Sequence, residues 1–163
     1  MKQVLAALAF AMLAFGAASH AAADEVAVIV HKSNPVMALT IAQLRTILLA
    51  PEPNWTTGGR ITVVLTRAGQ PERSGTLRII CGMSETDFNM HFIHGWRNAD
   101  GTTNRGNRQH PTVFETGVQV RQSVATTPNA VGFIKASQVD DSVKVVTVDG
   151  SSPGQPAYKL KFK

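Results

Sequence analysis

The sequence has little of several residue types on which small stable domains and enzymes often depend. Only one of its 163 residues is cysteine, so an intramolecular disulfide and a cysteine-rich metal site are both excluded. Charged residues make up 17% of the chain, whereas 44% of the residues are apolar. That apolar share is enough for a hydrophobic core and too high for a disordered chain. The length predicts one domain of ordinary size.

Catalytic signatures are also missing from the sequence. It contains no Gly-x-Ser-x-Gly elbow, no His-Glu-x-x-His pair and no Gly-x-x-x-x-Gly-Lys-Ser/Thr loop. Cys81 lies on the apolar side of a predicted helix with no histidine nearby in the chain, which indicates a buried structural thiol. Because no nucleophile, base and orienting group can be assembled, we expect a protein that is not an enzyme and uses no cofactor.

The first 23 residues have the three-part pattern of a secretory signal peptide. Lys2 gives a positive start and an apolar run follows from Val4 to Ala18. Both Ser19-His20-Ala21 and Ala21-Ala22-Ala23 then offer the small residues that signal peptidase reads, so cleavage after Ala21 or after Ala23 stays open. The apolar run is short for a membrane span. We therefore predict a signal peptide at residues 1–23 and one domain at residues 24–163, periplasmic or secreted and not membrane-spanning after cleavage. The formal charge of +5 favours an anionic partner, and export makes nucleic acid a poor candidate.

Strands and helices alternate along the predicted domain. Strands are predicted where β-branched and apolar residues run together, at residues 25–31, 60–66, 130–134 and 143–148. Helices are predicted behind capping residues or a first-turn proline: residues 41–49 behind Thr40, Pro71 to Gly82, a segment opened by Ser84 and reaching toward Trp96, and a segment behind Thr116. Residues 99–111 read as an exposed loop, and residues 158–162 as an edge strand or a frayed end. The alternation predicts an α/β fold with a mainly parallel sheet flanked by helices.

The loop between the second strand and the second helix is the main candidate site. Ligands of open α/β sheets bind at the carboxyl ends of strands, and a helix start favours anions. An arginine can hold an oxyanion with two hydrogen bonds, and a glycine allows close approach of the backbone. The alternative is an ordinary strand–turn–helix connection with solvated arginines. The candidate ligand-binding residues are Arg67, Gly69, Gln70, Arg73 and Ser74.

Three other groups carry weaker functional signals. His91, His94 and His110 could form a metal site, although no well-placed carboxylate or cysteine supports them, and we predict no metal. A second basic segment contains Arg97, Arg105 and Arg108. Asp140-Asp141 is more typical of a solvated turn than of a catalytic pair.

An ordered series of short motifs resembles the periplasmic phosphate-binding protein family, most closely its small single-domain members, the phosphate ABC transporter substrate-binding-like proteins. The series consists of Leu39-Thr40-Ile41-Ala42-Gln43-Leu44-Arg45, Asn54-Trp55, Arg67-Ala68-Gly69 and Thr127-Pro128-Asn129-Ala130-Val131-Gly132-Phe133. The resemblance implies a type II periplasmic-binding-protein-like fold without catalysis. It also implies phosphate or a similar oxyanion as ligand and an ABC permease or a membrane sensor as partner.

The family's phosphate loop carries over only in part. That loop reads Arg-x-Asp/Glu-Gly-Ser-Gly-Thr, and Arg67 matches its arginine, but Gly69 stands where the acid would be and Gln70 replaces a glycine. The literal Ser74-Gly75-Thr76 fits only after a shift of three residues. The family's first strand–helix unit is also reduced here, because few residues precede Pro35. The resemblance therefore implies about one lobe of the fold, and leaves open an accessory protein-interaction module that keeps the fold without the ligand.

Overall fold

The computed structural model describes residues 25–94, 96–97, 101–104 and 109–162. The predicted signal peptide lies outside these ranges, as do Arg105 and Arg108 of the second basic segment. None of the helices in the described part of the chain has the length and apolar character that a bilayer crossing requires.

The central sheet has five strands in the order β6-β3-β7-β1-β8. β3 pairs in parallel with β6 and β7, whereas β1 pairs antiparallel with β7 and β8. Four strands therefore run in one direction and β1 runs against them, so the predicted mainly parallel sheet is confirmed. The bounds are β1 Val26–Val30, β3 Thr62–Thr66, β6 Thr112–Phe114, β7 Ala130–Lys135 and β8 Lys144–Val145.

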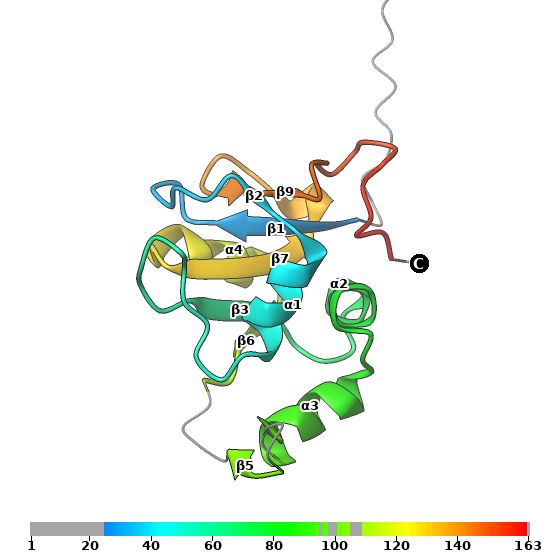
Figure 1. Cartoon of the computed structure of the whole chain (residues 1–163). Helices are drawn as coiled ribbons and strands as arrows, with labels where there is room; N and C mark the ends of the chain where they lie inside the picture. The colour runs from blue at the N-terminus through cyan, green and yellow to red at the C-terminus, as the bar shows by residue number, and fades with distance from the viewer. Residues whose placement is uncertain (1–24, 95, 98–100, 105–108, 163) are drawn as a thin grey trace, which may run out of the picture.

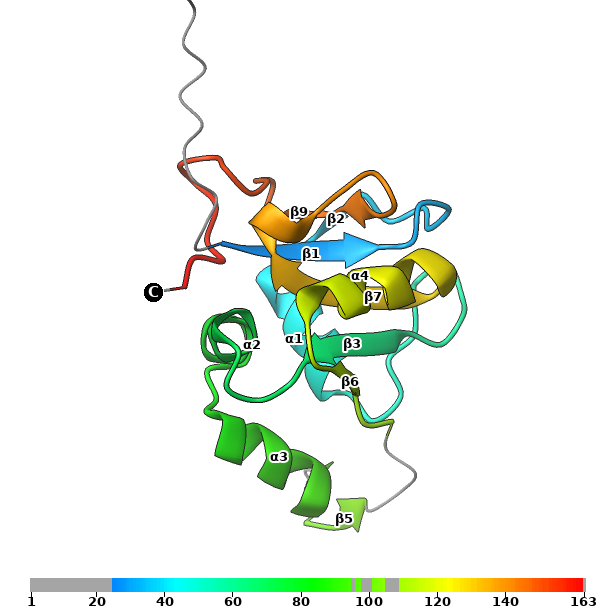
Figure 2. The same cartoon turned by 180° about the vertical axis from the view of Figure 1, so that it is seen from behind.

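Helices cover both faces and one end of this sheet. α4 lies on one face and α1 on the other, while α2 crosses the end of the sheet where β3 finishes (Figures 1 and 2). α3 follows α2 and lies below it in both views. The bounds are α1 Ile41–Leu49, α2 Pro71–Thr76 continued by a π-helical turn Leu77–Cys81, α3 Glu85–His94, α4 Gly117–Thr126 and a 3-10 turn Ala136–Gln138.

The helix ends follow from local side-chain chemistry. Thr40 caps α1 and Thr116 caps α4, each in a reciprocal capping box with a glutamine three residues later. Ser84 and Asp87 make the same reciprocal contacts at the start of α3. Gly82 ends the α2 segment in the left-handed conformation, with φ of 68°, where glycine has no Cβ to strain. These predicted boundaries are confirmed.

The central sheet separates two hydrophobic clusters. Alternate residues of β1, β3 and β7 point to opposite faces, as the pleat requires. One face packs against α1, the α2 segment, α3 and the C-terminal residues, and the other face packs against α4. Cys81 belongs to the first cluster, where burial raises its pKa from 9.0 to about 12. The thiol therefore stays protonated at neutral pH, which agrees with the predicted structural role.

Four segments differ from the sequence prediction or go beyond it. α3 ends at His94, and Trp96 begins strand β4 (Trp96–Arg97), which pairs with β5 (Thr103–Asn104) inside the predicted loop. The predicted strand 143–148 divides into β8 and β9 (Thr147–Val148); β9 pairs in parallel with β2 (Ala38–Leu39), outside the central sheet. β6 was not predicted at all.

The C-terminal segment 158–162 docks against β1 as an extended chain. Leu160 O accepts a hydrogen bond from Val26 N at 2.8 Å, and Tyr158 donates its hydroxyl to Val26 O. Tyr158, Leu160 and Phe162 are buried, while the lysines between them are exposed. The segment is therefore neither of the two predicted alternatives in full: it is docked and not frayed, but it forms only an isolated bridge between Lys161 and Glu25 and no strand.

Candidate functional site

The loop between β3 and α2 lies at the carboxyl edge of the sheet, as the sequence predicts. Gly69 has φ of +88°, a conformation that L side chains rarely adopt, and nothing lies within 4 Å of a Cβ built on it. The loop is therefore tight but open to solvent at its tip. Gln70 is the N-cap residue of α2 and makes no side-chain cap hydrogen bond, and Pro71 occupies the first helical position.

Arg67 leaves the end of β3 and reaches the start of α4. Its Nε lies 3.1 Å from Glu115 Oε2, and both side chains are more than half exposed. Gln70 Nε2 also reaches the Glu115 carbonyl oxygen at 3.5 Å. An exposed ion pair of this kind contributes less than about 1 kcal/mol, so the Arg67 guanidinium can exchange Glu115 for another anion at little cost.

Arg73 occupies a different environment. It is 5% exposed, and its Nε donates to both carboxylate oxygens of Glu85 at 3.0 Å while Nη1 donates to Thr66 O at 2.9 Å. The guanidinium also lies 5.9 Å from the centre of the Phe88 ring. Its positive charge is therefore already balanced by Glu85, and the side chain ties α2 to α3 and to the end of β3.

Ser74 lies on the outer face of α2. It is exposed and lines a cavity of about 530 Å³ together with Arg78, Ser84 and Phe162. The structure thus brings Arg67, Gly69 and Gln70 together in one loop, and it turns Arg73 inward and Ser74 outward.

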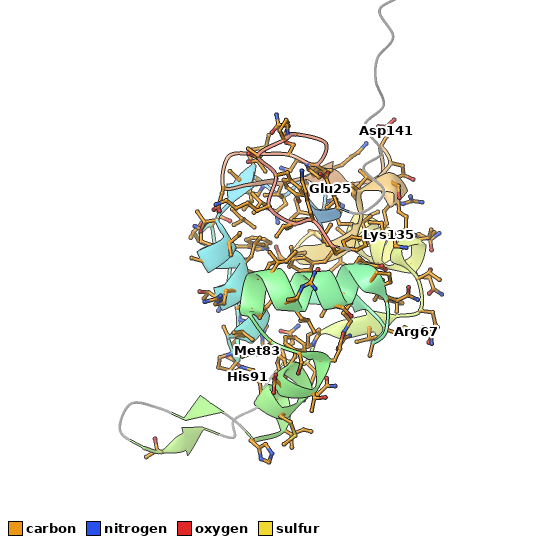
Figure 3. The ribbon with its side chains drawn as sticks, turned by 90° about the vertical axis from the view of Figure 1, so that its right-hand side faces the viewer. Glu25, Arg67, Met83, His91, Lys135 and Asp141 are labelled. Carbon is orange, nitrogen blue, oxygen red and sulfur yellow. The ribbon has the colours of Figure 1, made fainter. Side chains whose placement is uncertain are left out.

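Lys135 is a basic residue of this edge that sequence reasoning missed. β3 and β7 run parallel with Val64 opposite Gly132, so both strands end at the same edge of the sheet, where Arg67 follows β3 and Lys135 is the last residue of β7. Figure 3 shows both labelled side chains at the same end of the molecule, where α2 begins. Among the described residues Lys135 has no ion-pair partner. Its position at the carboxyl end of a predicted parallel strand was the signal that could have revealed it.

Glu72 is a buried acid in the first turn of α2. It is 2% exposed, and its Oε2 has no hydrogen-bond partner within the described part of the chain. No pattern in the sequence could have indicated this burial, because glutamate in a first helical turn is common and is usually solvated. The edge therefore combines two accessible cations, Arg67 and Lys135, with one buried carboxylate.

Of the weaker candidates, His91 and His110 both contact the Phe92 ring, and Asp140 lies elsewhere in a turn. His91 is half-buried and donates from Nε2 to Leu49 O at 2.9 Å, and the His110 ring is tilted by 39° against Phe92 with ring centres 5.1 Å apart. Across the ranges that the structure describes, no group of three His, Cys, Asp or Glu side chains could hold a metal ion. Asp140 accepts hydrogen bonds from Ser142, which lower the pKa of this exposed carboxyl and are typical of a turn.

Solved structures with a similar fold are phosphate-binding proteins. A Clostridium perfringens protein assigned as a phosphate ABC transporter substrate-binding protein and solved with bound phosphate is 29% identical, with a TM-score of 0.59 over 80% of this chain and 47% of its own. An ABC-type phosphate transport receptor from Vibrio cholerae is 22% identical, with a TM-score of 0.65 over 85% of this chain and 54% of its own. PstS from Borrelia burgdorferi is 14% identical, with a TM-score of 0.62 over 86% of this chain and 55% of its own.

These structures confirm the resemblance that the motif series indicates. The chain has the α/β architecture of the phosphate-binding proteins and spans about half of their length, which corresponds to about one lobe. No family model matches the sequence, and no curated protein matches it.

Proposed function

We propose that this chain is an exported, non-enzymatic binding protein that holds phosphate or a similar oxyanion at the loop between β3 and α2. The single observation that carries the proposal is that an exposed Arg67 and Lys135, which has no ion-pair partner among the described residues, both lie at the carboxyl edge of the sheet in a fold like that of phosphate-binding proteins. The anion would lie between these two cations, against the backbone of Gly69 and Gln70, where α2 presents its positive dipole end.

The five candidate residues take different parts in this proposal. Arg67 would replace its exposed contact to Glu115 by two hydrogen bonds to the anion. Gly69 would let the anion approach the backbone closely. The Gln70 side-chain amide, like Arg67, contacts Glu115, so both contacts would change together when the anion binds. Arg73 would act as a positioning residue, because it holds the end of β3 through Thr66 O. Ser74 faces the neighbouring cavity and would contact the anion only at its edge.

Calorimetric titration of residues 24–163 with phosphate, sulfate and nitrate tests the proposal. We expect phosphate to bind and Arg67→Ala to weaken that binding by about 10- to 100-fold, the loss expected for a charge-assisted hydrogen bond. Arg60→Ala is the matched control, because Arg60 precedes β3 as Arg67 follows it, and it also forms an exposed ion pair, with Glu52. Heat of binding that is equal in the two variants would move the site elsewhere.

A second candidate function is an accessory protein-interaction module that keeps the fold without the ligand. The Arg67–Glu115 pair favours it, because that pair already neutralises the arginine. Absence of heat with every oxyanion up to millimolar concentration would support this alternative and reject the first proposal. An ABC permease or a membrane sensor is the partner that either function would serve.

We further propose that residues 1–23 are a signal peptide and that the working protein is periplasmic or secreted. The supporting observation is the apolar run before Ala21-Ala22-Ala23, together with a first strand that begins at Val26. Intact mass spectrometry of the exported protein is expected to give a chain beginning at Ala22 or Asp24. Recovery of the soluble protein with Met1 still attached would contradict this expectation.

A further inference from the structure

A pocket between α3 and β6 lies outside the loop assigned to the oxyanion. Its volume is about 380 Å³, within the range of small-molecule sites. Its walls are mainly apolar and aromatic, and Ile93 and Val113 on its rim are 67% and 49% exposed. The lining residues are Arg73, Phe88, Asn89, Phe92, Ile93, His110, Pro111 and Val113.

One charged side chain reaches this pocket with hydrogen-bond donors to spare. A guanidinium has five N–H groups. Arg73 uses Nε–H for Glu85 and one Nη1–H for Thr66 O. The other three, on Nη1 and Nη2, donate to no residue that the structure describes, although the side chain is only 6% exposed. These N–H groups are therefore available to an acceptor in the pocket.

The charge balance of the pocket decides what kind of acceptor fits. Glu85 already neutralises Arg73, so a carboxylate entering the pocket would lose its hydration without meeting an unpaired cation. A carbonyl oxygen has a much smaller desolvation cost and can accept from the free N–H groups. The rings of Phe88, Phe92 and His110 offer faces and edges to an aromatic guest.

We propose that this pocket binds a small uncharged molecule that carries an apolar ring and one carbonyl-type acceptor. The ring would lie against Phe92 and His110, and the acceptor would receive hydrogen bonds from Arg73. None of Arg67, Gly69 or Gln70 lines the pocket; Arg73 is shared, because it donates hydrogen bonds here and holds the end of β3 at the oxyanion loop.

Nuclear magnetic resonance titrations of the ¹⁵N-labelled protein with acetophenone, benzoate and benzene test the proposal. Each compound is added up to about 10 mM, because molecules of so few atoms bind weakly. We expect acetophenone to shift the backbone amides of Phe92 and Val113 and the Nε–H signal of Arg73. Benzoate and benzene are each expected to bind at least about tenfold more weakly, the first for its charge and the second for its missing acceptor. Equal or tighter binding of benzoate would overturn the assignment to uncharged ligands.

A filling variant locates the ligand. Val113→Trp places a large ring in the mouth of the pocket and is expected to abolish the acetophenone shifts. The matched control is Val118→Trp, because Val118 is 40% exposed on α4 and does not line the pocket. If Val113→Trp does not fold, Asn89→Trp fills the same pocket from α3. Shifts that persist in a folded filling variant, or no shifts in the unmodified protein, would reject the site. Titration of the same variants with phosphate measures binding at the oxyanion loop separately.

Discussion

Replacement of Arg73 by methionine is expected to lower the free energy of unfolding by about 3 kcal/mol or more, the cost of breaking a buried ion pair on one side. Methionine fills much of the same volume but leaves the Glu85 carboxylate and Thr66 O without their donor. It also removes the only side chain that links α2, α3 and the end of β3 by hydrogen bonds within the described residues. Urea denaturation followed by circular dichroism measures the change.

The partner and a surface pair provide the controls for this expectation. Glu85→Gln should cost less than Arg73→Met, because the Glu85 side chain is 24% exposed and water can replace part of its contact. The double variant should cost clearly less than the sum of the two single changes, since each removes the same interaction. Glu52→Gln breaks the exposed pair with Arg60 and should change stability by no more than about 1 kcal/mol. A loss no larger for Arg73→Met than for Glu52→Gln would show that the buried pair is not stabilising.

Replacement of Gly75 by alanine is expected to lower the free energy of unfolding by about 1–3 kcal/mol, the usual range for overpacking. A Cβ at Gly75 would lie 2.6 Å from Phe162 Cβ, and the Phe162 ring is held against α2 by the docked C-terminal segment. The loss occurs although alanine favours a helix more than glycine does. Thermal or urea denaturation gives the value, and Ser74→Ala on the exposed face of the same turn should change stability little.

Shortening the phenylalanine should reverse the sign of this effect. In a Phe162→Gly background, which removes the Phe162 Cβ as well as the ring, the added Cβ has room, so Gly75→Ala is expected to stabilise the protein by up to about 1 kcal/mol through helix propensity. A destabilisation of the same size in both backgrounds would mean that Phe162 is not the cause. The pair of measurements also tests whether the C-terminal segment packs on α2 in solution.

Helix boundaries were predictable because their causes are local. The capping residues Thr40 and Thr116 and the C-cap Gly82 act within one turn of the chain, and each has the contacts expected from its sequence. The strands β1, β3 and β7 were predictable because their residues are buried on both faces, which leaves uninterrupted β-branched runs. Strand β6 was missed because it is a three-residue edge strand with two exposed positions, and it forms only because β3 offers an unpaired edge.

In the candidate site, too, some features follow from local sequence and others depend on tertiary packing. The sequence determined that Arg67, Gly69 and Gln70 follow a strand and precede a helix, and that chain order alone placed them at the carboxyl edge of the sheet. The side-chain directions within α2 depend on packing, so Arg73 turns inward to Glu85 and Ser74 turns outward. Lys135 lies at the same edge as Arg67 because β7 pairs in parallel with β3, and such pairing brings together residues that are far apart in the chain.

By itself, then, the sequence determined the α/β class, the helix ends, the buried strands and a basic loop before a helix, all of which follow from short-range patterns of burial and capping. Only the tertiary structure decided which cations remain accessible. Arg67 lies in solvent beside an exposed glutamate, whereas Arg73 is buried against Glu85 and lines a separate pocket. The reason is that burial and partner choice depend on how α2 crosses the sheet and meets α3, which no local pattern in the chain encodes.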